Sequence, residues 1–109
     1  AEAGDDAELL REIAHSYAVL ARVQGGPGAN HLGDHDGAAR SIDRALALNE
    51  RARELRPGDD LLARQRIGLL WQRSSALRGL GDLRGAEEVA QRAQRAVEEL
   101  DPADGSLEV

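Results

Sequence analysis

A cluster of imidazole and carboxylate side chains follows the first quarter of the chain, and these are groups that bind divalent metal ions. The cluster comprises His31, Asp34, His35 and Asp36. Its spacing matches no established pattern of metal ligands. Asp34 also stands where a helix needs an N-cap, and histidine is common in surface turns. We therefore expect structural roles for these residues, with no metal and no cofactor, and keep a metal site as the alternative interpretation.

A glycine-rich segment just before this cluster superficially resembles a phosphate-binding loop. It contains Gly25, Gly26 and Gly28 around Pro27. A P-loop needs a Lys followed by Ser or Thr after its glycines and a strand before them, and neither is present. The segment is typical of a long turn between two helices, which could still serve as a contact surface.

No arrangement of residues indicates catalysis. No serine stands with a histidine and an acid in a recognisable nucleophile context, and the chain has no cysteine. Two carboxylate pairs, Glu87-Glu88 and Glu98-Glu99, fall on a face of a predicted helix that would be solvated. We expect a protein without enzymatic activity and without catalytic residues.

The composition favours an all-α protein. Of the 109 residues 41% are hydrophobic, yet there is no Phe or Met, and Tyr17 and Trp71 are the only aromatic residues. A core must therefore be built from Leu, Ile, Val and Ala, which suit close packing of helices.

The charge pattern limits the partners. Fourteen basic residues, all of them Arg, are spread among twenty acidic ones, and the net charge is −6. A nucleic-acid partner is therefore not expected. No segment has the length of apolar sequence that a membrane span or a signal peptide needs, so we expect no membrane partner and a cytoplasmic location.

Hydrophobic periodicity predicts four helices, over about 5–24, 34–57, 59–79 and 82–102. Asp5 would cap the first helix. Its expected buried face comprises Leu9, Ile13, Ala14, Tyr17, Leu20 and Ala21. The second helix aligns Ala38, Ile42, Ala45, Leu46, Asn49, Ala52 and Leu55, and the third aligns Leu62, Ile67, Leu70, Ser74 and Leu77. The fourth aligns Ala86, Val89, Ala90, Ala93, Ala96, Val97 and Leu100.

An internal repeat determines the expected architecture. The segment LGDHDGAARSIDRAL from Leu32 matches LGDLRGAEEVAQRAQ from Leu80, 48 residues later, at Leu, Gly, Asp, Gly, Ala and a later Arg-Ala. In each copy, Leu-Gly-Asp would end one helix and cap the next. The repeat therefore predicts two antiparallel helical hairpins.

These residues resemble the tetratricopeptide repeat (TPR), which has Leu-Gly-Asp at its turn and a small residue four positions after the Asp. The matching positions are Ala38, Ile42, Ala45 and Pro57 in the first copy, Ala86, Ala90, Ala93 and Pro102 in the second, and Ile13, Ala14 and Tyr17 on the first helix. The sequence departs from the family in its 48-residue spacing, longer than the usual 34 or so, and in Arg73, where an apolar residue is expected. The long helices and the glycine-rich turn are also similar to the repeat tails of some bacterial serine/threonine protein kinases.

The resemblance implies a TPR-like α-solenoid fragment over residues 5–102, with hairpins at about 5–57 and 59–102 and a tail at 103–109 that is native or left by cloning. It implies a protein- or peptide-binding scaffold, a regulatory or docking part of a larger protein. The alternative is a self-association element of a bacterial signalling kinase, through which two copies would form a homodimer.

The partner would bind the concave side of the repeat, which the first helix of each hairpin lines. The residues expected there are Glu8, Arg11, His15, Ala18, Trp71, Ser75 and Arg78. Trp71 would be an apolar anchor in this interface, with a place in the core as the alternative. Arg11 and His15 stand where repeats that clamp a chaperone's terminal carboxylate have Lys and Asn, so that kind of clamp is not indicated.

Overall fold

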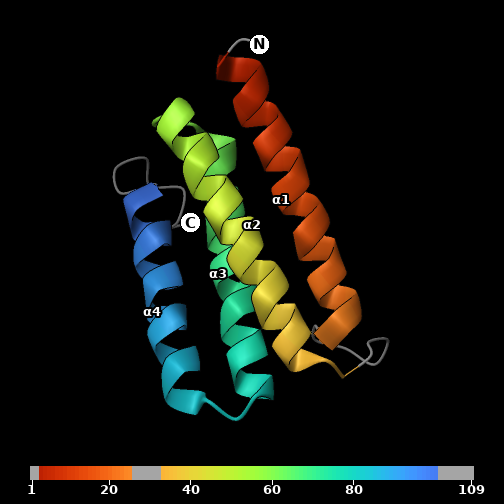
Figure 1. The fold of residues 1–109 in the computed structure, drawn as a ribbon. Coiled ribbons are helices and arrows are strands. Elements are labelled where there is room, and N and C mark those ends of the chain that lie inside the picture. The colour runs from red at the N-terminus through yellow and green to blue at the C-terminus, as the bar shows by residue number, and fades with distance from the viewer. Residues whose placement is uncertain (1–2, 26–32, 101–109) are drawn as a thin grey trace.

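The structure is all-helical. The computed structural model describes residues 3–25 and 33–100, and this part contains four helices and no strand (Figure 1). The helices are α1 (Ala3–Gly25), α2 (His35–Leu55), α3 (Asp60–Gly79) and α4 (Leu83–Leu100). The expected all-α class and the order of the four helices are confirmed. One predicted boundary is wrong: α1 begins at Ala3, so Asp5 lies inside the helix and is not its N-cap.

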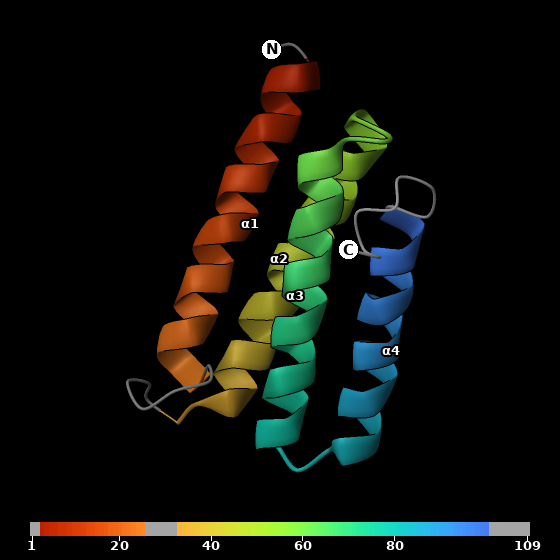
Figure 2. The ribbon, with the colours of Figure 1, turned by 180° about the vertical axis from the view of Figure 1, so that it is seen from behind.

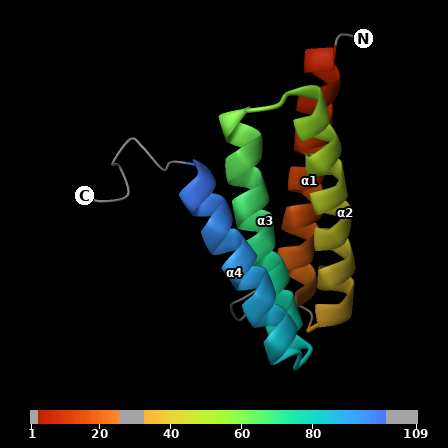
Figure 3. The same ribbon diagram turned by 90° about the vertical axis from the view of Figure 1, so that its left-hand side faces the viewer.

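The helices run alternately up and down and stack in chain order. Each helix packs against the next one, and α1 also touches α3. α1 and α4 form opposite edges of the molecule in views from the front and from behind (Figure 1, Figure 2). In the side view, α3 lies between α4 and the α1–α2 pair (Figure 3). Among the described residues α1 and α4 share no contact, so each edge helix keeps an outer face that no other helix covers.

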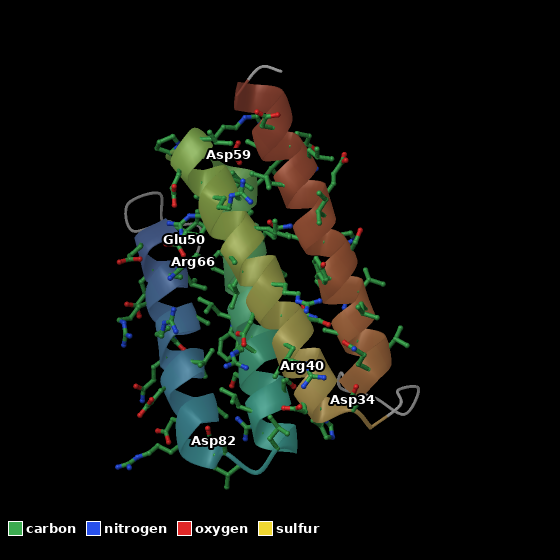
Figure 4. All side chains as sticks on the ribbon, viewed as in Figure 1. Asp34, Arg40, Glu50, Asp59, Arg66 and Asp82 are labelled. Atoms are coloured by element: carbon green, nitrogen blue, oxygen red, sulfur yellow. The ribbon has the colours of Figure 1, made fainter. Side chains whose placement is uncertain are left out.

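The repeated Leu-Gly-Asp motif builds the same helix start twice. The Asp34 carboxylate accepts a hydrogen bond from the Gly37 amide at 2.8 Å, and Asp82 accepts one from Gly85 at 2.9 Å. A Cβ on Gly37 or on Gly85 would lie within 2.3 Å of the capping carboxylate, so a larger residue at this position would require the Asp side chain to shift. Asp34 and Asp82 lie at one end of the molecule and Asp59, the N-cap of α3, at the other (Figure 4).

Small residues fill the contact between α1 and α2. The buried side chains of α1 are those of Ala7, Ala14, Ala18 and Ala21, and they cluster with Ala38, Ala45 and Ala52 of α2. Small side chains on both surfaces allow two helix axes to approach closely. Larger core residues come from the centre of the stack, namely Ile42, Leu62, Leu69 and Leu70.

The predicted buried face of α1 is wrong in three positions. Leu9, Ile13 and Leu20 were expected in the core, but their exposed fractions are 56%, 38% and 44%. The alanine stripe of α1 faces α2 instead, and this turns the large side chains outward. In α2, Leu55 is also exposed, whereas the other predicted core positions of α2, α3 and α4 are buried or half-buried.

Polar side chains connect the layers of the stack. Asn49 is buried and donates from Nδ2 to the Leu62 carbonyl (3.0 Å) and to Gln65 (2.9 Å). Gln65 in turn donates to the Arg11 carbonyl of α1, and Gln72 donates to that of Ala18. These bonds fix α3 against both α1 and α2.

The alanine contact makes a specific stability prediction. Ala45 is fully buried between the first two helices, whereas Ala47 is exposed on the same helix. We expect Ala45→Leu to lower the free energy of unfolding by about 1–3 kcal/mol, because the added methyl groups force the helices apart. Ala47→Leu is the matched control and should change it by less than about 0.5 kcal/mol. Urea unfolding followed by circular dichroism measures both, and equal effects would contradict close packing at Ala45.

Candidate functional site

Trp71 lies on a groove between α3 and α4. The side chain is 46% exposed, so the alternative that it belongs to the core is wrong. The groove has a volume of about 380 Å³ and, within the described residues, is lined from these two helices alone. Its lining comprises Trp71, Glu87, Ala90, Gln91, Gln94 and Arg95. The Trp71 ring and the Ala90 methyl group form an apolar patch beside amide and charged groups.

The sequence missed the α4 side of this groove. All the expected binding residues were placed on the first helix of each hairpin, whereas Ala90 and Gln94 come from the second helix of the second hairpin. The amphipathic pattern of α4 predicted only a buried apolar face and solvated charges. The polar residues that flank this buried face are the sequence signal that could have identified the α4 side of the groove.

Three of the expected binding residues of α1 are polar and at least partly exposed. Glu8 and Arg11 are half-exposed and pair with each other through two contacts, one of them 3.1 Å from Arg11 Nε to Glu8 Oε2. This hydrogen-bonded pair lowers the pKa of Glu8 below its ordinary value and raises the pKa of Arg11. His15 is exposed on the same helix.

The remaining predicted residues differ in their exposure. Ala18 was expected to face a partner, but it is 5% exposed and belongs to the alanine core between α1 and α2. Ser75 is half-buried next to that core, and Arg78 is exposed near the end of α3. The groove at Trp71 therefore includes one of the seven predicted residues.

Arg73 explains one departure from the expected repeat pattern. It occupies a position where an apolar residue was expected, and its Nε lies 2.9 Å from Asp43 Oδ1 of α2. This ion pair joins α3 to α2. A charged side chain is therefore accommodated at this position because Asp43 of the neighbouring helix pairs with it.

A second hollow, polar in character, lies where the C-terminal parts of α2 and α4 meet the start of α3. Its volume is about 300 Å³, and it is lined by Arg53, Gly58, Asp59, Asp60, Ala63, Arg66, Ala96, Glu99 and Leu100. Burial lowers the pKa of Arg66, and the positive charges of Arg53 and Arg92 lower it further. Glu99 and Glu50 act in the opposite direction; Figure 4 labels Arg66 and Glu50. The mixture of guanidinium and carboxylate groups favours no single kind of ion.

Three residues of the metal cluster considered from the sequence make other contacts. Asp34 caps α2, the ring of His35 packs beside Gly79 with Nδ1 3.2 Å from the Gly25 carbonyl, and Asp36 pairs with Arg40. His31 lies outside the described residues. Within the described part, no three His, Cys, Asp or Glu side chains are grouped so that they could hold a metal ion.

Comparison with protein-family models, with curated proteins and with solved structures finds no match to this chain. Over residues 3–25 and 33–100, no helix combines the length and the apolar character that crossing a membrane requires.

The ion pair on α1 predicts a pH dependence. Because its folded pKa is depressed, Glu8 stabilises the fold above its ordinary pKa, and this contribution is lost as the pH falls through the folded value. In NMR titrations, the Glu8 carboxyl should have a midpoint below the ordinary value, and Arg11→Gln should raise it toward that value. High salt should reduce the difference. An identical Glu8 midpoint in both proteins would rule out Arg11 as the cause.

Proposed function

We propose that this chain is a non-catalytic, TPR-like protein-interaction module that binds a peptide segment of its partner in the groove at Trp71. The supporting observation is a tryptophan left 46% exposed beside a hollow of about 380 Å³. Tryptophan is the side chain most enriched among residues that dominate binding energy at protein interfaces. Because about half of the Trp71 surface is exposed, Trp71 contributes less to the stability of the fold than a buried tryptophan would.

The lining of the groove indicates the chemistry of the segment. Trp71 and Ala90 would contact one apolar side chain of the partner. Gln91 and Gln94 carry both donors and acceptors, which suits the amide groups of a peptide backbone. Glu87 and Arg95 provide one charge of each sign, so the segment would carry an apolar residue flanked by polar or charged ones.

Two features support the TPR-like part of the proposal. The Leu-Gly-Asp motif caps a helix in both copies through the same hydrogen bond to a glycine three residues later. The helices stack in chain order without closing into a bundle, which suits a repeat protein. By the resemblance of the sequence, the module would serve as a regulatory or docking part of a bacterial signalling kinase.

The experiment is a selection of peptides from a random display library against the chain, with binding measured by the fluorescence of Trp71. Because this is the only tryptophan in the sequence, its emission reports on the groove directly. We expect selected peptides to shift the emission to shorter wavelength, and Trp71→Ala to weaken their binding by at least about tenfold, typical of an interface hot spot.

Leu61→Ala is the matched control, because Leu61 is exposed on the same helix and does not line the groove. It should leave peptide affinity within about twofold. Peptides that bind with unchanged Trp71 emission, and equally well to the Trp71→Ala variant, would contradict the proposed site.

A further inference from the structure

The outer face of α1 carries large apolar side chains at a regular interval. The residues are Leu9, Ile13, Ser16, Leu20 and Val23, at alternating intervals of four and three. This interval is the heptad repeat, by which a helix presents one continuous stripe to another helix. These five residues are here named the α1 seam. At 1.5 Å per residue the seam is about 21 Å long.

The α1 seam is exposed along its whole length. Its four large side chains are 56%, 38%, 44% and 50% exposed, in sequence order, and Ser16 is exposed as well. The exposure results from the alanine stripe on the other side of α1, which holds that side against α2. A contiguous exposed apolar stripe marks an interaction surface.

Ser16 does not prevent burial of the seam. Its hydroxyl donates to the Glu12 carbonyl of the same helix at 3.2 Å, so it does not need a water molecule as acceptor. A small residue in the middle of the seam also lets a second helix come close.

The other edge of the molecule cannot supply the matching surface. Apart from Leu83 at its start, the exposed residues of α4 are all polar or charged. They are Arg84, Glu87, Glu88, Gln91, Arg92, Gln94, Arg95, Glu98 and Glu99. Head-to-tail stacking of α1 on α4 would bury these charges against leucine and valine. Within residues 3–25 and 33–100, the continuous apolar stripe that matches the α1 seam is therefore the α1 seam of a second copy.

Charge determines the relative direction of the two copies. The first half of α1 is acidic overall, because Asp5, Asp6, Glu8 and Glu12 outnumber Arg11, whereas Arg22 is the one ionic residue after Glu12. A parallel pair would place the acidic halves side by side. An antiparallel pair places each acidic half against the half that carries Arg22, and it also opposes the two helix dipoles favourably.

We propose that two copies of this chain form a two-fold symmetric dimer through their α1 seams, with the helices antiparallel and the axis near Ser16. Leu9 of each copy then lies toward Val23 of the other, and Ile13 toward Leu20. The groove at Trp71 belongs to α3 and α4 and stays open, so the dimer does not depend on the proposed peptide site. A contact made mainly by one helix is smaller than the standard interface, and we expect a dissociation constant of roughly 1–100 μM.

Sedimentation velocity over a dilution series tests the dimer. The unmodified chain should shift from dimer to monomer as it is diluted through this range. Leu20→Glu should weaken the association at least tenfold, because it places a carboxylate in the contact. Leu83→Glu is the matched control, since Leu83 is a similarly exposed leucine on α4, and it should leave the dissociation constant unchanged. The helical circular dichroism of both variants should equal that of the unmodified chain.

Cross-linking tests the direction of the helices. The chain has no cysteine, so an introduced one is unique. Ser16→Cys should form an intermolecular disulfide on mild oxidation. Leu9→Cys alone should not, whereas a mixture of the Leu9→Cys and Val23→Cys variants should form the mixed disulfide. Efficient Leu9→Cys self-linking would overturn the antiparallel arrangement.

A monomer at all concentrations up to about 0.5 mM would overturn the dimer and assign the α1 seam to another occupant, such as a different protein or a helix of a longer parent chain. Equal weakening by Leu20→Glu and Leu83→Glu would place any self-association elsewhere. Neither result affects the peptide groove, because that site is tested in the Trp71 variant.

Discussion

Close contact between the alanines of α1 and α2 determines the orientation of the first helix, and with it the surfaces that the molecule presents. Ala14, Ala18 and Ala21 lie in one buried cluster with Ala38 and Ala45. An alanine contact gains little from burial of each side chain, but it lets many backbone and Cβ atoms touch. α1 can bury its alanines or its large apolar residues against α2, and not both.

This constraint gives the two edges of the stack different properties. At one edge, α1 presents the exposed apolar seam. At the other, α4 buries Val89, Ala93 and Ala96 and presents charged side chains to water. Trp71 lies on the α3–α4 side, away from the seam. The described helices thus present a charged edge with a groove beside it and an opposite edge with an apolar stripe, and the two proposals follow from these two surfaces.

The sequence predicted the helices, their order and both Leu-Gly-Asp caps, because caps and breaks are local chemistry. It also predicted most of the buried face of α2, where small and large apolar residues share one side. It failed for α1, because Leu9, Ile13 and Leu20 have a helical period that fits a core as well as an exposed seam. Which stripe faces inward depends on the partner helix, and no property of α1 alone decides it. Trp71 was identified as an anchor, but the residues that complete its groove come from the next helix and depend on tertiary packing.

The methyl groups of the three isoleucines give the most direct test of the α1 orientation. In a monomeric sample, a soluble paramagnetic agent should broaden the NMR signal of the Ile13 methyl most strongly and that of Ile42 least, because Ile13 is 38% exposed and Ile42 is 1% exposed. Ile67 is half-buried and should fall between them. Protection of Ile13 equal to that of Ile42 would show that the large residues of α1 face the core, and would contradict the alanine contact and the exposed seam together.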